Sequence, residues 1–86
     1  MVKVEFFGIP RQRTGVSHTT LEATTIGNLL NLLAQQYPDF RDTCMEEEQL
    51  TKDVLVSVNG KTTTRDRACP LQENDNVLIL TADVGG

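Results

Sequence analysis

The chain has 86 residues, which predicts one small domain with a modest core. Its net charge is −4 and its lysines and arginines are scattered, which argues against a nucleic-acid-binding surface and slightly favours a basic protein partner. Apolar runs fall short of the ~20 residues that span a bilayer, and the N-terminus lacks the apolar core of a signal peptide. These features predict a cytoplasmic protein that does not associate with membranes.

The chain offers few side chains for catalysis or metal binding. Two cysteines, Cys44 and Cys69, are too few for a disulfide framework, a four-thiolate metal site or an iron–sulfur cluster, so we expect free thiols, at least one of them part-buried. The acidic run at residues 46–48 is expected to be a solvated surface. The one histidine, His18, is expected at the surface and not as a general base.

The first third of the chain predicts a hairpin followed by a helix. Apolar and polar residues alternate over residues 2–8, which predicts a strand ended by Ile9-Pro10, with a turn at Gly15. Residues 16–23 predict a weaker second strand. A helix then begins after the N-cap Thr25 and ends at Pro38, because the residue before a proline avoids the helical conformation.

The rest of the chain predicts a loop and three more strands. Residues 39–53 are expected to form a loop with one short helical turn. Residues 54–58 predict a strand buried on both faces, and Asn59-Gly60 predicts a hairpin turn before a short strand at residues 61–64. Residues 77–81 predict a last strand that is too apolar to lie at the edge of a sheet.

A central last strand pairs most simply with the first strand, in parallel, with the helix as a right-handed crossover between them. The predicted fold class is therefore α+β, a β-grasp (ubiquitin-like) fold with a mixed sheet packed on one main helix. Residues 1–81 form the β-grasp domain in this interpretation, and residues 82–86 form a flexible C-terminal Gly-Gly tail.

The tail is the feature that predicts chemistry. Gly85 and Gly86 lack side chains, so an arm that ends in them is able to thread a narrow channel and present its carboxylate to a buried site. Attack of that carboxylate on the α-phosphate of ATP gives an acyl-adenylate, which a sulfur nucleophile opens. The predicted reacting group is the Gly86 carboxylate.

Several motifs, spread over nearly the whole chain, carry a resemblance to one protein family. They are Phe6-Phe7-Gly8 with Gly15, Thr25-Ile26, Tyr37-Pro38, Val56-Ser57-Val58-Asn59-Gly60, Pro70-Leu71 with Asp75 and Val77, and Val84-Gly85-Gly86. With these motifs the sequence is similar to the MoaD and ThiS type of ubiquitin-like sulfur carriers, and it most resembles MoaD, the small subunit of molybdopterin synthase. ThiS chains are usually shorter between the helix and the third strand, so residues 39–53 favour the MoaD branch.

The resemblance implies a carrier cycle in which the catalytic groups belong to partners. A ubiquitin-activating-type adenylating enzyme uses Mg-ATP to activate Gly86, and a sulfur donor then converts it to a thiocarboxylate. The large catalytic subunit of molybdopterin synthase, or an equivalent acceptor, receives the sulfur, and the carrier itself binds no cofactor. Gly85 and Val84 fit the partner's channel, and Phe7 docks partners, although core packing is an alternative role for Phe7.

Three alternatives remain open at this stage. Ala82-Asp83 stands where the family usually has prolines, which leaves room for a sulfur carrier of another pathway: thiamin thiazole synthesis, cysteine synthesis or tRNA thiolation. The same activated Gly86 would also suit a ubiquitin-like modifier that joins lysines of other proteins. A plain ubiquitin-like interaction domain is the third alternative.

Overall fold

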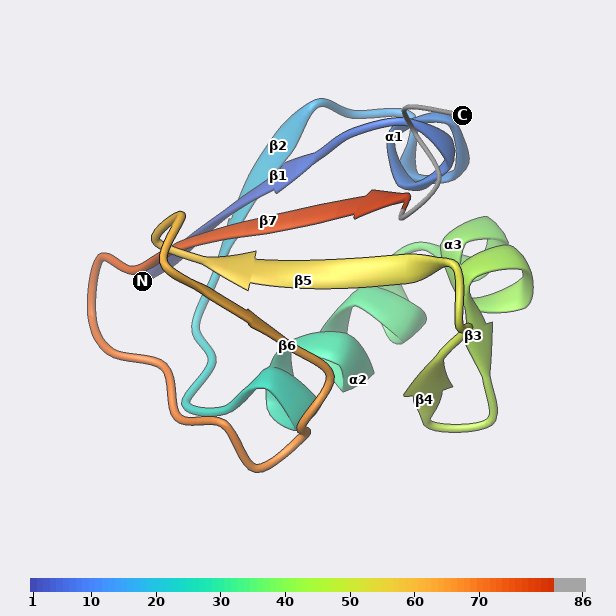
Figure 1. The fold of residues 1–86 in the computed structure, drawn as a ribbon. Helices are drawn as coiled ribbons and strands as arrows, with labels where there is room; N and C mark the ends of the chain where they lie inside the picture. The colour runs from blue at the N-terminus through green and yellow to red at the C-terminus, as the bar shows by residue number, and fades with distance from the viewer. Residues whose placement is uncertain (82–86) are drawn as a thin grey trace.

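The computed structural model describes residues 1–81, and these form one mixed sheet backed by helices (Figure 1). The predicted tail lies outside the described residues. The sheet has five strands in the order β2-β1-β7-β5-β6, and the pairing of β1 with β7 is parallel while the other pairings are antiparallel. The strands are β1 (Val2–Phe6), β2 (His18–Leu21), β5 (Val54–Val58), β6 (Thr62–Thr64) and β7 (Asn76–Thr81).

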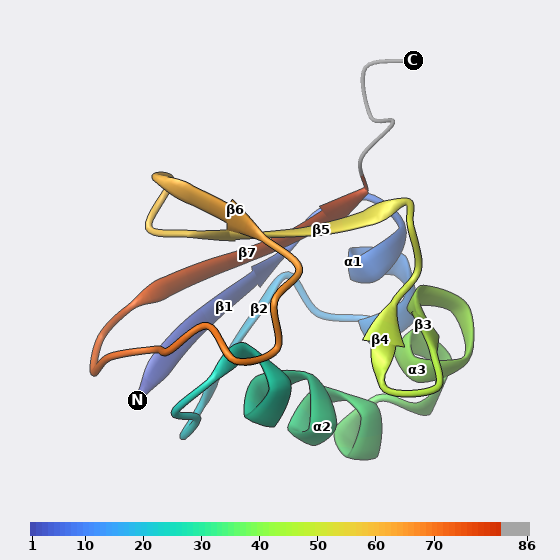
Figure 2. The ribbon, with the colours of Figure 1, turned by 60° about the horizontal axis from the view of Figure 1, so that its bottom comes forward.

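The main helix, α2 (Ile26–Gln36), covers the inner face of this sheet (Figure 2). Its N-cap is Thr25, as predicted, and the Thr25 side chain accepts a hydrogen bond from the Asn28 amide at 3.0 Å. The apolar stripe of α2 meets the inward side chains of β1 and β7. This arrangement confirms the predicted α+β β-grasp fold, including the central position of the last strand.

The segment between α2 and β5, predicted as a loop with one short helical turn, contains a longer helix and a hairpin, so the prediction of a loop is wrong for most of it. Pro38 ends α2 and also begins a second helix, α3 (Pro38–Cys44), which proline permits in a first helical turn. Phe40 and Cys44 lie one turn apart and are both fully buried, which anchors α3 on the core. A two-stranded hairpin, β3 (Met45–Glu46) with β4 (Gln49–Leu50), follows, and the acidic run at residues 46–48 is exposed around its turn, as predicted.

The turn predicted after the first strand is also a helix, α1 (Ile9–Thr14). Gly15 ends it in the left-handed conformation, with φ of 77°, and its amide donates to the Arg11 carbonyl at 3.0 Å. α1 has six residues and buries only Pro10. A helix this short, with one buried residue, produces no apolar stripe, so the hydrophobic pattern of the sequence did not predict it.

The prediction that β5 is buried on both faces is also wrong. Val54, Val56 and Val58 are buried under the helices, whereas Leu55 and Ser57 on the outer face are only half-buried. In Figure 2, α2 and α3 lie below β5, so these helices cover one side of the sheet. The Asn59-Gly60 turn is confirmed, because both residues have positive φ and the Lys61 amide donates to the Val58 carbonyl at 3.0 Å.

Candidate functional site

The carboxyl end of β7 is where the domain meets the predicted tail. β7 lies between β1 and β5, and its arrow in Figure 1 points toward α1 and α3. Thr81 is its last residue, and residues 82–86 follow directly in the sequence. Three predicted site residues, Val84, Gly85 and Gly86, therefore lie outside the described residues, and the structure gives the point from which they continue.

Thr81 is held at this point by the start of α1. Its side chain is 6% exposed, and its hydroxyl oxygen accepts a hydrogen bond from the Ile9 amide at 3.2 Å. Gly8, the N-cap of α1, has φ of 65°, and a Cβ placed there would lie 2.8 Å from the Thr81 hydroxyl. This contact was not predicted from the sequence, where the one signal, a polar residue at an inward position of an apolar strand, does not identify the partner.

Phe7, the fourth predicted site residue, lies outside the core. Phe6 points inward and is 1% exposed, whereas the Phe7 side chain is 45% exposed. Its amide donates to the Ile79 carbonyl at 2.9 Å, which extends the β1–β7 pairing by one residue. Core packing is therefore not the role of Phe7.

Half-buried leucines continue the apolar surface beside Phe7. Extension of the β1–β7 register places Phe7 next to Leu80, and Leu80 pairs with Leu55 of β5. Leu78, two residues earlier on β7, faces the same way and is also half-buried. We call Phe7, Leu55, Leu78 and Leu80 the outer apolar face.

A hollow of about 420 Å³ adjoins this face over β1 and β2. Phe7 and Arg11 lie among its lining residues, as do Lys3 and Asn76 from the region where β7 begins. Outward side chains of the two strands, Glu5 and His18 among them, also line it. The hollow is therefore lined by one exposed aromatic ring together with charged and hydrogen-bonding side chains.

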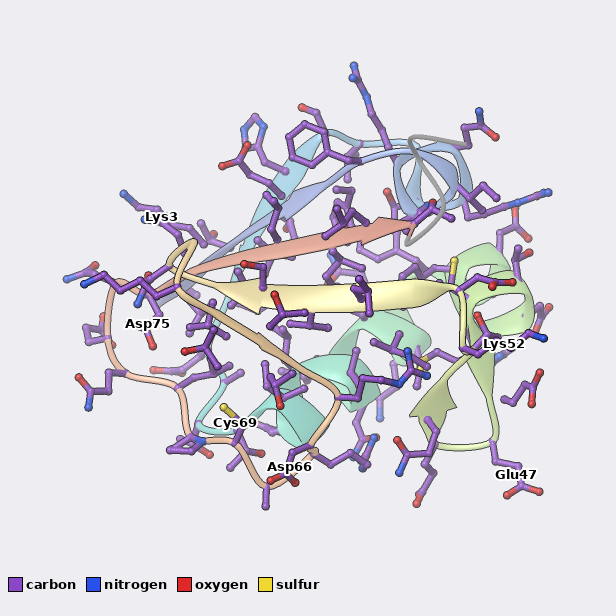
Figure 3. The ribbon with its side chains drawn as sticks, in the orientation of Figure 1. Lys3, Glu47, Lys52, Asp66, Cys69 and Asp75 are labelled. Atoms are coloured by element: carbon purple, nitrogen blue, oxygen red, sulfur yellow. The ribbon has the colours of Figure 1, made fainter. Side chains whose placement is uncertain are left out.

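Charge is distributed unevenly between this face and the rest of the domain. Among the outward positions of the five strands, all within residues 1–81, Glu5 is the only acidic side chain, whereas Lys3 lies on the same face and Arg11 beside it. Figure 3 shows Glu47 and Asp66 projecting from the hairpin and from the segment after β6. The acidic surplus of the chain therefore does not extend to the outer apolar face.

The two thiols are free, as predicted. Cys44 is buried in α3, and burial raises the pKa of its thiol to about 11, although the nearby Arg13 acts in the opposite direction. Cys69 is half-buried in the segment between β6 and β7 (Figure 3). His18 is exposed, as expected, and its Nδ1 lies 3.0 Å from the Ser17 hydroxyl.

Residues 1–81 contain neither a metal-ligand cluster nor a membrane-spanning helix. The described side chains include no cluster of three potential metal ligands. In the same part of the chain, none of the helices has the length and apolar composition needed to cross a membrane. The candidate functional features of the described residues are therefore the end of β7 and the outer apolar face.

Solved structures share this fold over almost the full chain. Small archaeal modifier protein 1 from Methanosarcina acetivorans matches with a TM-score of 0.84 and 23% identity, covering 99% of this chain and 95% of that one. The BexX/CysO complex of Amycolatopsis orientalis contains a chain that matches with a TM-score of 0.83 and 22% identity, covering 100% of both.

A third solved structure comes from an archaeon. It is a protein of Pyrococcus furiosus, provisionally described as molybdopterin converting factor subunit 1, with a TM-score of 0.75 and 24% identity. The match covers 93% of this chain and 94% of that one. At these identities the three structures show the shared fold.

Sequence comparison adds the family. No curated protein matches the chain. The sequence model of the ThiS family matches residues 4–86, a range that includes β7 and the terminal Gly85-Gly86. The chain therefore belongs to the ThiS family and is a ubiquitin-like sulfur carrier of the ThiS/MoaD type.

Proposed function

We propose that this chain is a sulfur carrier that presents sulfur on its C-terminal Gly86. The observation that carries the proposal is the ThiS family match, which runs through the central strand to residue 86. Residues 1–81 are the rigid domain of this carrier and residues 82–86 are its arm. Gly86 supplies the reacting carboxylate, and Gly85 and Val84 fit the channel of the partner.

The proposed cycle needs little chemistry from the carrier itself. An oxygen of the Gly86 carboxylate attacks the α-phosphate of ATP, pyrophosphate leaves, and an acyl-adenylate forms. A hydrosulfide ion delivered by the donor then attacks the acyl carbon and displaces AMP, and loss of the S–H proton leaves a thiocarboxylate. A ubiquitin-activating-type enzyme binds the Mg-ATP and supplies the catalytic groups, because a carboxylate needs a leaving group before it reacts as an electrophile.

The outer apolar face is the proposed docking surface for these partners. Phe7 is an exposed aromatic side chain, the type of residue that anchors protein interfaces, and the half-buried leucines extend its apolar area. Lys3 and Arg11 at the rim favour a partner surface that carries acidic groups. CysO, whose fold this chain shares, occurs in a solved complex with BexX, which supports binding of such a domain to a partner protein.

We place the carrier in molybdopterin synthesis, as the small subunit of the synthase. The motif resemblance to MoaD supports this assignment, as does the fold likeness to the Pyrococcus furiosus protein. The segment that distinguishes this chain from typical ThiS chains is ordered, with α3 and the β3–β4 hairpin. Thiamin thiazole synthesis, cysteine synthesis and tRNA thiolation are the alternative destinations of the sulfur.

Intact-mass spectrometry tests the carrier role directly. The chain is incubated with ATP, a sulfur donor and a candidate adenylating enzyme, and we expect a mass gain equal to replacement of one oxygen by sulfur. Deletion of Gly86 should abolish the gain and leave the thermal unfolding transition unchanged, because the deleted residue follows the last strand. No gain on the full chain, while a known carrier is thiolated in parallel, would overturn the proposal.

The acceptor is identified by a second incubation. The thiocarboxylated chain is mixed with the large subunit of molybdopterin synthase and its pterin precursor, or with a thiazole synthase or cysteine-forming enzyme. We expect the thiocarboxylate to revert to a carboxylate only in the first mixture, with formation of the dithiolene product. If the thiocarboxylate reverts only with one of the other enzymes, the carrier belongs to the pathway of that enzyme.

A protein-modifier role is the second candidate, because the family type includes modifiers and the fold matches that of small archaeal modifier protein 1. It predicts conjugates on a denaturing gel that disappear when Gly86 is deleted. A plain interaction domain, in contrast, predicts partner binding that survives removal of both Gly85 and Gly86.

A further inference from the structure

Thr81 is an unusual residue at its position in the sheet. The inward positions of β7 are occupied by Val77, Ile79 and Thr81, and Thr81 is the one buried polar side chain among residues 1–81. A buried hydroxyl costs free energy unless it forms a hydrogen bond. Valine or isoleucine would fill the same space without that requirement, so the hydroxyl calls for a specific explanation.

The partner of this hydroxyl is the first amide of α1. Amides of the first helical turn have no partner within the helix, and a side chain at the N-cap usually accepts from one of them. The N-cap here is Gly8, which has no side chain to do so. The Thr81 hydroxyl accepts from the Ile9 amide instead, across 72 residues of sequence.

Gly8 is required by this contact for two independent reasons. Its backbone, with φ of 65° and ψ of −134°, lies in a region that side chains strongly disfavour. A Cβ there would also lie 2.8 Å from the Thr81 hydroxyl oxygen, closer than real contacts allow. Gly8 therefore permits the close approach between the start of α1 and the end of β7.

The contact joins two features of the proposed carrier. Phe7, the docking side chain, comes directly before Gly8, and its amide is bonded to the Ile79 carbonyl at 2.9 Å. Thr81, bonded to Ile9, comes directly before the arm. Two hydrogen bonds, one on each side of Gly8, therefore fix the position of Phe7 relative to the first atom of the arm.

We propose that Thr81, Gly8 and the Ile9 amide form an arm junction that positions the C-terminal arm for reaction. This inference rests on the proposed function. A partner that binds the outer apolar face then receives the arm from a fixed starting point, the end of β7, which reduces the number of positions that Gly86 samples relative to the bound ATP. Thr81 and Gly8 are positioning residues, because they act on the geometry of Gly86 and do not touch the reacting atoms.

The magnitude of the expected effect follows from the geometry of group transfer. A displacement of about 1 Å at the reacting atoms costs about 100-fold in rate. Loss of the hydrogen bond between Thr81 and Ile9 should lower the rate by less than this, because β7 keeps its pairing with β1 and β5 and the arm still reaches the site. We expect about a tenfold loss of kcat for adenylate formation, with little change in KM, because the docking surface remains intact.

The test uses variants that remove the same bond from opposite sides. Thr81→Val keeps the shape of the side chain and removes the acceptor, whereas Ile9→Pro removes the donor at a helix position that tolerates proline. Thr81→Ser keeps the hydroxyl and should retain the wild-type kcat. Thr63→Val, on an exposed threonine of β6, is the matched control for the substitution itself.

The readouts are the kcat and KM of adenylate formation at varied carrier concentration, with hydrogen exchange of the Ile9 amide as a check on the bond. We expect Thr81→Val and Ile9→Pro each to lower kcat about tenfold, and the double variant to lose no more than either alone, because both remove one interaction.

Three results would overturn the inference. These are a wild-type kcat in both single variants, equal losses in Thr81→Val and Thr81→Ser, and a loss that appears entirely in KM. Absence of adenylate on the wild-type chain would instead refute the proposed function, and the inference with it.

Discussion

Burial gives the two thiols of this protein different reactivity. The nucleophile in alkylation is the thiolate, and a raised pKa keeps Cys44 protonated at neutral and mildly basic pH. Cys44 is also enclosed by the core, whereas Cys69 is half-buried near the surface. In the folded protein the more reactive thiol is therefore that of Cys69.

Alkylation with iodoacetamide at pH 8 should therefore modify Cys69 and leave Cys44 intact. Peptide mass spectrometry measures the extent of modification at each position, and alkylation in denaturant should modify both. Equal alkylation of both thiols in the folded protein would contradict this prediction.

The free energy of unfolding should also depend on pH through Cys44. The pKa of Cys44 rises from 9.0 to about 11 on folding, so its contribution to stability is present below pH 9 and is lost as pH rises through 11.

The exposed ring of Phe7 provides the second prediction at this scale. Phe7→Ala should weaken binding to the adenylating enzyme by about 2 kcal/mol, or roughly 30-fold in Kd, as at the anchor residue of an interface. The melting temperature should change little, because the ring is not part of the core. Isothermal titration measures the affinity.

Val16→Ala is the matched control for Phe7→Ala, since Val16 is another exposed apolar side chain. It should bind like the wild type. Unchanged affinity in Phe7→Ala, or an equal loss in both variants, would remove Phe7 from the docking surface.

At the scale of elements, a single arginine fastens the β3–β4 hairpin to the sheet. The Arg65 guanidinium donates hydrogen bonds of 2.7 Å to the carbonyls of Leu50, Thr51 and Val54. Leu50 belongs to β4 and Val54 begins β5, so the planar group bridges a peripheral hairpin and a core strand. The fork of fixed donors makes this geometry possible, and a lysine ammonium does not reproduce it.

Arg65→Lys should therefore lower the free energy of unfolding by about 1–3 kcal/mol, the usual cost of carbonyl groups that lose a charged donor. Urea denaturation measures the loss. Arg41→Lys is the control, because Arg41 is bonded only to the exposed neighbouring Asp42 and should cost almost nothing. Equal stability of the two variants would show that the Arg65 bonds contribute little.

Elements with a strong periodic pattern were predictable, and short elements set by tertiary packing were not. The stripe of α2 and the Asn59-Gly60 turn are local signals that the fold retains. α1 buries one residue, and α3 depends on two buried side chains placed one turn apart, so neither produces a stripe long enough to distinguish from a loop. The error at β5 has a related cause, because an apolar run does not say whether the outer face is covered.

The whole-molecule topology followed from one inference, that an apolar last strand lies at the centre of the sheet. The β1–β7 pairing confirms it, with Phe6 opposite Ile79. The site was only partly accessible to the same reasoning. Alternation along β1 predicted an outward Phe7, but the contact of Thr81 with Ile9 spans 72 residues and no local pattern encodes it.

The parallel pairing of the first and last strands also has a consequence for synthesis of the protein. β7 fills the gap between β1 and β5, so the sheet cannot close until the last strand has left the ribosome. Pairing between chain ends makes folding depend on contacts of large sequence separation, which form late. A chain that stops before Asn76 lacks the central strand, so β1 and β5 have no partner along their facing edges. A protein that recognises the closed sheet therefore binds only chains whose synthesis has passed β7.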